Sequence, residues 1–138
     1  MGLPDTWLPH LTRRALGGSP AEVNEAPTRK RRRDEDALQR AVCQYLALRR
    51  LDFHSHPNER KAHPIEIARL KAMGMMPGIA DLEINVGPSA YFIELKTETG
   101  RLSPAQRTFR DDCRRLGKPW GLARSVEDVA ELLKGWNL

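Results

Sequence analysis

The chain has 138 residues and a formal net charge of +5, which fits one compact domain with a single core and leaves no room for a second. No apolar run approaches the roughly 18 residues of a membrane span, and the N-terminus lacks the charged-then-apolar order of a signal peptide. We therefore expect a soluble intracellular protein with no membrane partner, cytoplasmic in a bacterial or phage-infected cell or nuclear in a eukaryote. The two cysteines, Cys43 and Cys113, have no CxxC spacing, so neither a disulfide framework nor a thiolate metal site is predicted.

The positive charge is concentrated near the N-terminus. Residues 1–33 contain seven Lys or Arg and three Asp or Glu, whereas residues 34–138 contain 16 and 15. The first segment has many Pro and Gly and no sustained periodicity, so we predict a flexible basic arm at 1–33, in which a short helix could form around residues 7–16, and a folded domain at 34–138. The TRKRRR run is either a solvated linker or a phosphate-binding arm that contacts DNA through Arg31, Arg32 and Arg33.

Residues 34–50 predict the first helix, with Asp34 as N-cap. Its apolar stripe consists of Leu38, Ala41, Val42, Tyr45 and Leu46. A short strand at 51–56 and a short helix at 64–73 follow. His54 and His56 share one face of that strand, and with His63 they could form a zinc site. The spacing matches no standard cluster and a fourth ligand is missing, so turn and cap roles are favoured.

Residues 81–96 predict a β-hairpin with two distinct faces. Leu82, Ile84, Val86, Tyr91, Ile93 and Leu95 alternate onto an apolar face, whereas Asp81, Glu83, Asn85, Glu94 and Lys96 alternate onto a polar one. With a four-residue loop at 87–90, Val86 faces Tyr91, and Asp81 then lies opposite Lys96 and diagonal to Glu94. Carboxylates without Cys or His nearby favour Mg²⁺ or Mn²⁺. The ordinary alternative is a solvated hairpin whose acids and lysine pair across strands.

The C-terminal part predicts two helices around a short strand. Ser103, Pro104 and Gln106 give a capping box for a helix that ends near Leu116. A strand at 119–123 and a second capping box at Ser125 precede the last helix, which ends near Gly135. The first of these helices and its end carry basic residues that are either DNA contacts or a solvated face: Arg107, Arg110, Arg114, Arg115 and Lys118. The whole order is that of a mixed α/β domain.

The segments GMMPGIADLEI and YFIELKTETGRLSPAQRTF, preceded by HPNERKA, resemble the VRR-NUC family of the PD-(D/E)xK nuclease superfamily, over roughly residues 34–133. The resemblance implies a restriction-endonuclease-like core, with a central mixed β-sheet flanked by helices. It implies that Asp81 and Glu94 bind metal and that Lys96 is the catalytic lysine. The Pro77 to Asp81 spacing is wider than the superfamily name suggests.

Three further acids and one amide have alternative roles under the same resemblance. Glu35 would be the acid of the first helix that joins the metal shell. Alternatively, it only interacts favourably with the helix dipole, or the neighbouring Asp34 or Asp36 takes the place in the metal shell. Gln106 would be the glutamine after the lysine, although its capping-box position already explains it. Glu59 and Glu83 are further candidate acids, and Glu83 becomes the fallback ligand if the hairpin is paired differently.

The function implied is that of a Mg²⁺- or Mn²⁺-dependent DNA endonuclease acting on branched DNA such as four-way junctions. Small free-standing members of the family resemble Holliday-junction resolvases of DNA repair and act as homodimers, which place two sites on two strands. Two alternatives stay open: a flap- or end-directed nuclease, and a catalytically silent DNA-binding module of the same fold.

Overall fold

The computed structural model describes residues 28–56 and 63–138. The elements, in chain order, are α2 (Arg29–Leu48), β1 (Asp52–Ser55), α3 (Pro64–Ala72), β2 (Leu82–Val86), β3 (Ser89–Leu95), α4 (Pro104–Arg115), β4 (Trp120–Ala123) and α5 (Val126–Gly135). This order of helices and strands is the predicted one. The helix considered around residues 7–16 lies outside the described residues.

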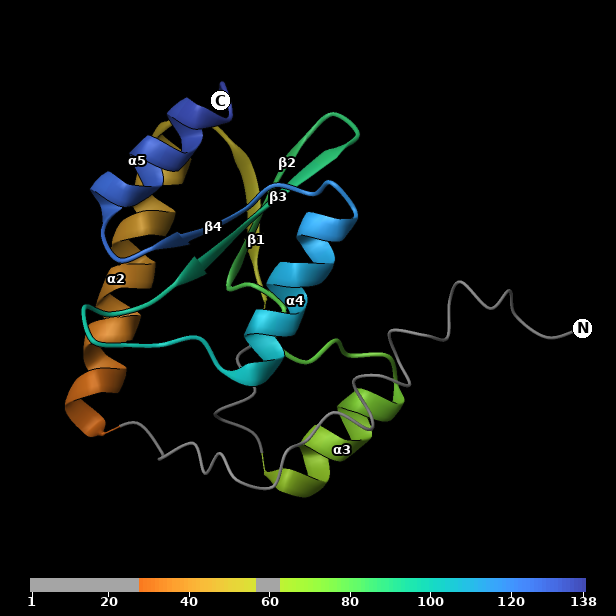
Figure 1. Ribbon diagram of the computed structural model, residues 1–138. Helices are drawn as coiled ribbons and strands as arrows, with labels where there is room; N and C mark the ends of the chain where they lie inside the picture. Colours follow the sequence, from red (N-terminus) through yellow and green to blue (C-terminus); the bar gives the residue numbers. More distant parts are fainter. Residues whose placement is uncertain (1–27, 57–62) are drawn as a thin grey trace, which may run out of the picture.

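The four strands form one sheet in the order β1-β2-β3-β4. The first three strands are antiparallel, and β4 pairs parallel to β3 after the α4 crossover. Helices α2 and α5 cover one face of the sheet and α4 covers the other, whereas α3 lies apart from the sheet (Figure 1). The predicted mixed sheet flanked by helices is therefore confirmed.

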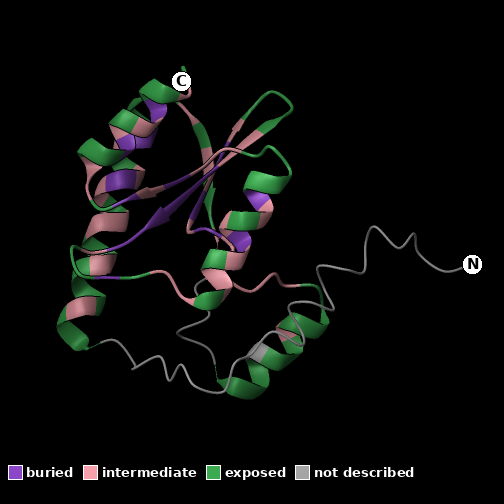
Figure 2. Cartoon of the chain, in the orientation of Figure 1, coloured by how far each residue is buried: buried purple, intermediate pink, exposed green. Residues whose placement is uncertain are grey.

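Each face of the sheet has its own apolar cluster. On the α2 and α5 side, the cluster includes Leu46, Leu82, Ile84 and Ile93, which are fully buried. On the α4 side, a smaller cluster is formed by Ala80, Phe92, Phe109 and Cys113. Buried residues accordingly concentrate along the central strands and on the inward sides of the helices (Figure 2). Because the second cluster is small, polar side chains at its border can lie under α4.

Helix α2 begins five residues earlier than expected. Thr28 is the N-cap, and its side-chain oxygen accepts a hydrogen bond from the Arg31 amide at 3.2 Å. The prediction that Asp34 caps the helix is wrong, because Thr28 is itself a capping residue and Lys and Arg favour helices. Arg31, Arg32 and Arg33 therefore lie in the first turns of a helix. The boundary placed between residues 33 and 34 falls inside α2, and residues 1–27 lie outside the described residues.

The hairpin of β2 and β3 has a tighter turn than expected. Val86 pairs with Ser89, so the turn contains only Gly87 and Pro88, and the predicted Val86–Tyr91 pairing is wrong by two residues. Gly87 has φ +56, which suits the first central position of a type II′ turn. A shift by two residues keeps every side chain on its face. The predicted faces are therefore right although the partners differ.

Among the described residues, no helix is both long enough and apolar enough to cross a membrane.

Candidate active site beneath helix α4

The hairpin brings the two predicted carboxylate ligands next to each other. Leu82 pairs with Ile93, so continuing the register by one residue puts Asp81 opposite Glu94, not opposite Lys96 as expected. The Asp81 Oδ2 atom accepts a hydrogen bond from the Leu95 amide at 2.8 Å. This bond fixes the Asp81 carboxylate at the open end of the hairpin, beside the Glu94 side chain.

Glu94 is the centre of a small buried network. Its Oε1 atom accepts a hydrogen bond from Gln106 Nε2 at 2.7 Å and lies 3.3 Å from Lys96 Nζ. Glu94 and Lys96 are each only 1% exposed. Within residues 28–56 and 63–138, the other oxygen, Oε2, is buried and receives no hydrogen bond. A buried carboxylate oxygen is costly unless a donor or a cation satisfies it.

Burial is the main cause of an altered acidity at Glu94. Desolvation, reinforced by the nearby Asp81 carboxylate, raises the pKa of Glu94 from 4.5 to about 8, and Lys96 offsets only part of this rise. The Asp81 and Glu94 carboxyl groups also share a hydrogen bond when one of them carries the proton. Two carboxylates that repel each other in a dry site are stabilised by a divalent cation, and such all-oxygen donors suit Mg²⁺ or Mn²⁺.

The N-terminus of α4 positions Gln106. The Ser103 side chain accepts from the Gln106 amide at 3.2 Å, and the Ser103 amide donates to Gln106 Oε1 at 2.8 Å. The predicted capping box is therefore confirmed. Because Oε1 is held by the cap, Nε2 points to Glu94. The sequence left capping and a role in the site as alternatives for Gln106. The structure has both, because Oε1 of its side-chain amide belongs to the cap and Nε2 of the same amide contacts Glu94.

A glycine that sequence analysis did not single out holds α4 against the site. Gly78 has φ +71, and a Cβ at this position would lie 2.3 Å from the Ala105 backbone and 2.6 Å from the Gln106 amide nitrogen. Only glycine permits this approach. The turn before Asp81 and the cap of α4 are thus in direct backbone contact, which couples the positions of Asp81 and Gln106. The Pro77-Gly78 pair in GMMPGIADLEI was the feature of the sequence that could have identified this glycine.

Glu35 is held by Arg31 at the start of α2. Its Oε1 atom lies 3.6 Å from Arg31 Nε, and its side chain is 17% exposed. A Cβ at Gly100 would lie 3.3 Å from Lys96 Cδ and 3.5 Å from Arg31 Nη2. Arg31 and Lys96 therefore flank the same glycine, which puts the Arg31–Glu35 pair at the border of the network. Whether Glu35 joins a metal shell stays a prediction.

Arg124, at the end of β4, secures the loop that follows Lys96. Its Nη1 donates to the carbonyl oxygens of Thr97, Glu98 and Gly100. The Lys96 amide in turn donates to the Ala123 carbonyl at 3.0 Å. The backbone on both sides of Lys96 is fixed by β4 and its following residue. No local pattern in the sequence predicted this role of Arg124.

The described residues that were predicted to contact DNA belong to two helices, α4 and α2, or directly follow α4. Arg107, Arg114, Arg115 and Lys118 are exposed on or just after α4, Arg110 is half-buried, and Arg32 and Arg33 are exposed on α2. Several have intrahelical ion pairs: Arg110 and Arg114 with Asp111, and Arg115 with Asp112. Each pair has at least one exposed partner, and ion pairs at the surface are weak. Their role in binding stays a prediction.

His54 of β1 and His56, which directly follows that strand, gather with an unexpected partner. His54 Nε2 and His56 Nε2 lie 3.4 Å and 2.9 Å from the same oxygen of Glu83. Among the described residues, the possible metal-holding group contains Glu83 in place of His63. His63 instead caps α3, where its Nδ1 accepts from the Ile65 amide. Glu83 pairs with Phe92 and contacts these two histidines, and its use as a fallback ligand beside Glu94 stays a prediction. Glu59 lies outside the described residues.

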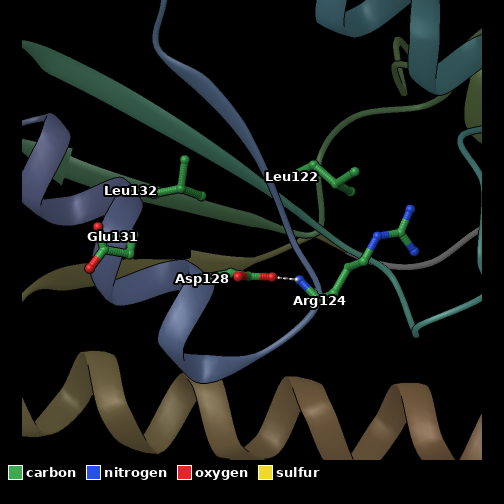
Figure 3. A pocket seen from close by; sticks show the side chains of 5 residues that line it. All are labelled: Leu122, Arg124, Asp128, Glu131 and Leu132. Carbon is green, nitrogen blue, oxygen red and sulfur yellow. Dashed lines mark hydrogen bonds between the residues drawn. The ribbon is translucent and has the colours of Figure 1, made fainter.

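A shallow pocket lies elsewhere, beside β4 and α5. It is lined by Leu122, Arg124, Asp128, Glu131 and Leu132. Asp128 Oδ2 accepts from the Arg124 amide at 2.8 Å (Figure 3), and Ser125 caps α5 by accepting from the Asp128 amide. In the second predicted capping box, the Asp128 side chain should accept from the Ser125 amide. It accepts from the amide of Arg124, the residue before the cap. The pocket includes neither Asp81 nor Glu94.

Comparison with known proteins supports the architecture. A solved structure described as a VRR_NUC domain protein superposes with a TM-score of 0.60 at 23% sequence identity, covering 75% of this chain and 87% of that chain. No family model and no curated protein matches the sequence. At this identity the likeness shows a shared fold, which is the expected α/β arrangement of a mixed four-stranded sheet flanked by helices.

Proposed function

We propose that the chain is a VRR-NUC-type nuclease: a Mg²⁺- or Mn²⁺-dependent endonuclease that hydrolyses phosphodiester bonds in branched DNA such as four-way junctions. The observation that carries the proposal is the convergence of Asp81, Glu94, Lys96 and Gln106 in one network beneath α4, in which Glu94 and Lys96 are buried. The fold likeness to a VRR_NUC domain protein supports the same assignment.

The donor set fits a hard divalent ion. Asp81 and Glu94 would hold it, with the Glu94 Oε2 atom that lacks a hydrogen bond in the described structure as one ligand. Glu35 is the proposed third acid, acting directly or through water. When bound, Mg²⁺ or Mn²⁺ supplies Lewis-acid activation of water and neutralises charge on the phosphate.

The protein groups around the carboxylates have separable roles. Gln106 holds Glu94 Oε1 and thereby orients the carboxylate toward Asp81. Lys96 keeps a cation at Oε1, where it can position the attacking water or balance the negative charge that develops on the phosphate in the transition state. Desolvation strengthens both effects, because charges interact more strongly in a site that excludes water.

Two further features belong to the proposal. The body is close to neutral, so the shape of the DNA and local basic residues would select the substrate, with the α4 arginines and Arg31, Arg32 and Arg33 as phosphate contacts. A homodimer would supply two sites for the two strands of a junction. Its existence is tested by the mass of the full-length protein in light scattering, alone and with DNA.

The activity test compares end-labelled four-way junction, flap and linear duplex in Mg²⁺, Mn²⁺ or EDTA. We expect metal-dependent cleavage near the branch point. Asp81→Asn and Glu94→Gln should each lower the rate by about 10²–10³-fold or more. Both keep the shape of the side chain, and Asn can still accept from the Leu95 amide. Glu131→Gln, an exposed acid on α5, is the matched control.

The other outcomes separate the alternatives. Preferential cleavage of flaps or ends would replace the junction assignment while keeping the nuclease. Tight binding without cleavage of any substrate, in either metal, would contradict the enzyme assignment and favour the silent binding module. Cleavage that survives both carboxylate variants would place the active site elsewhere.

A further inference from the structure

A second group of metal-ligating side chains lies on the same face of the sheet, one strand further out. His54 lies in the edge strand β1 and His56 directly follows it, where its amide still bonds to the Asp81 carbonyl, so their side chains project to the same face. His54 pairs directly with Glu83 of β2. Glu83 therefore stands between two imidazoles, and the histidine rings are 5.1 Å apart in a T-shaped arrangement.

The distances suit one tetrahedral ion. The three candidate ligand atoms lie within 4.8 Å of one another, and the Glu83 oxygen is 3.4 Å from His54 Nε2 and 2.9 Å from His56 Nε2. Ligands bound about 2.0–2.2 Å from zinc at tetrahedral angles lie roughly 3.3–3.6 Å apart. Small side-chain rotations would therefore bring all three ligands onto one ion, without any change of the backbone.

Asn85 provides a partner for the other ring nitrogen of His54. Its side-chain nitrogen lies 3.5 Å from His54 Nδ1, and the oxygen and nitrogen of an amide exchange places when the group is flipped. With its oxygen toward the ring, Asn85 would accept the Nδ1 proton and leave Nε2 free to bind a metal. Such outer partners orient metal-binding histidines.

We propose that His54, His56 and Glu83 form a zinc-type metal site that is separate from the Asp81–Glu94 centre. Two imidazoles and one carboxylate are a borderline donor set that suits Zn²⁺ better than Mg²⁺. Water would complete the coordination, since the His54 side chain is 54% exposed. The site would fasten the edge strand β1 to β2.

The proposed zinc site lies close to Asp81, so an ion bound there would affect the backbone of the carboxylate centre. Glu83 is two residues from Asp81, or about 6–7 Å along the strand. The His56 amide donates to the Asp81 carbonyl at 2.9 Å. An ion on His56 and Glu83 would therefore hold the backbone at the Asp81 carbonyl and in the two residues that follow it.

Direct metal binding tests the proposal on the full-length protein. Calorimetric titration with Zn²⁺ alone should show one tight site per chain, and Co²⁺ should give the visible absorption of a tetrahedral site. Glu83→Gln and His56→Asn should weaken Zn²⁺ binding by more than the roughly 10–100-fold that outer-partner losses cost. His63→Asn is the matched control and keeps a residue able to cap α3. It should leave binding unchanged.

A second variant separates this site from the carboxylate centre. The double variant Asp81→Asn/Glu94→Gln should keep the Zn²⁺ site, because none of its ligands is changed. Absence of a stoichiometric zinc site, equal affinity in Glu83→Gln and His63→Asn, or loss of zinc in the double variant would each overturn the proposal. The readout is independent of DNA cleavage, so it does not depend on the proposed nuclease activity.

Discussion

Glu94 combines the properties that single out a functional carboxylate. It is buried, it contacts Lys96 and Gln106, and one of its oxygens receives no hydrogen bond from the described residues when both Glu94 and Asp81 are ionised. A group used only for stability would rarely keep a buried acceptor unsatisfied. The raised pKa of Glu94 and the nearby Asp81 carboxylate also indicate a functional role for this residue. These properties support the proposed role of Glu94 as a metal ligand.

The raised pKa makes the stability of the metal-free protein depend on pH. Because the pKa of Glu94 rises from 4.5 to about 8 on folding, the folded state binds more protons than the unfolded state between these values. The free energy of unfolding therefore falls as the pH rises from about 5 to 8, by at most about 1.4 kcal/mol per pH unit.

Urea unfolding in EDTA at several pH values measures this dependence. Glu94→Gln should flatten the decline and be more stable than the wild type at pH 8. Glu131→Gln, with an exposed acid on α5, should retain the wild-type profile. A Glu94→Gln profile as steep as that of the wild type would show that another group is responsible.

The elements were largely predictable because their local signals were strong. Ser103, Pro104 and Gln106 are a complete helix start, and the apolar alternation of β2 and β3 fixed which side chains face the core. The predicted register was wrong because a four-residue loop was assumed. The dipeptide Gly87-Pro88 suits a two-residue type II′ turn. The contact of Gly78 with α4 joins distant segments, so local patterns could not reveal it.

The Gly78 contact predicts an unusually costly glycine substitution. Gly78→Ala would put a Cβ 2.3 Å from the Ala105 backbone, adding overpacking to the cost of a positive φ. We expect a loss of about 2–5 kcal/mol in the free energy of unfolding.

Gly117→Ala is a close control for the backbone term. Gly117 has φ +69, close to the φ +71 of Gly78, but a Cβ there would meet no atom within 4 Å. Its loss should be about 1–2 kcal/mol. Equal losses in the two variants, measured by urea unfolding, would contradict the proposed contact between the turn and α4.

At the scale of the molecule, the arrangement of the sheet and its helices was predicted correctly, whereas the location of the basic residues was not. The order of helices and strands predicted a mixed α/β domain, and the family resemblance implied a mixed sheet; the structure confirms both. The basic run was expected in an arm, whereas Arg29 to Arg33 form the first turns of α2. Glu83 was missed as a partner of His54 because cross-strand neighbours depend on register, which composition does not encode.

The position of the basic run changes the expected effect of truncation. Residues 1–27 contain only Arg13 and Arg14 against three acids, so deleting them should leave the salt dependence of DNA binding unchanged. Arg32→Gln/Arg33→Gln should reduce the slope of log K against log salt by up to about 2, because each lost phosphate contact lowers it by about 0.9.

Fluorescence anisotropy with junction DNA in EDTA measures the slopes. Arg40→Gln, an exposed arginine later on α2, is the control and should retain the wild-type slope. A flatter slope after deletion of residues 1–27, or an equal effect of Arg40→Gln, would contradict the assignment of phosphate contacts to Arg32 and Arg33.

The most direct test of the central claim is the single-turnover cleavage rate of a four-way junction at saturating Mn²⁺, for the wild type and Lys96→Met. Methionine keeps much of the buried volume but removes the cation beside Glu94, and Lys134→Met on the exposed side of α5 controls for loss of charge. We expect a rate lower by about 10²–10³-fold in Lys96→Met alone. Cleavage by folded Lys96→Met at the wild-type rate would contradict it.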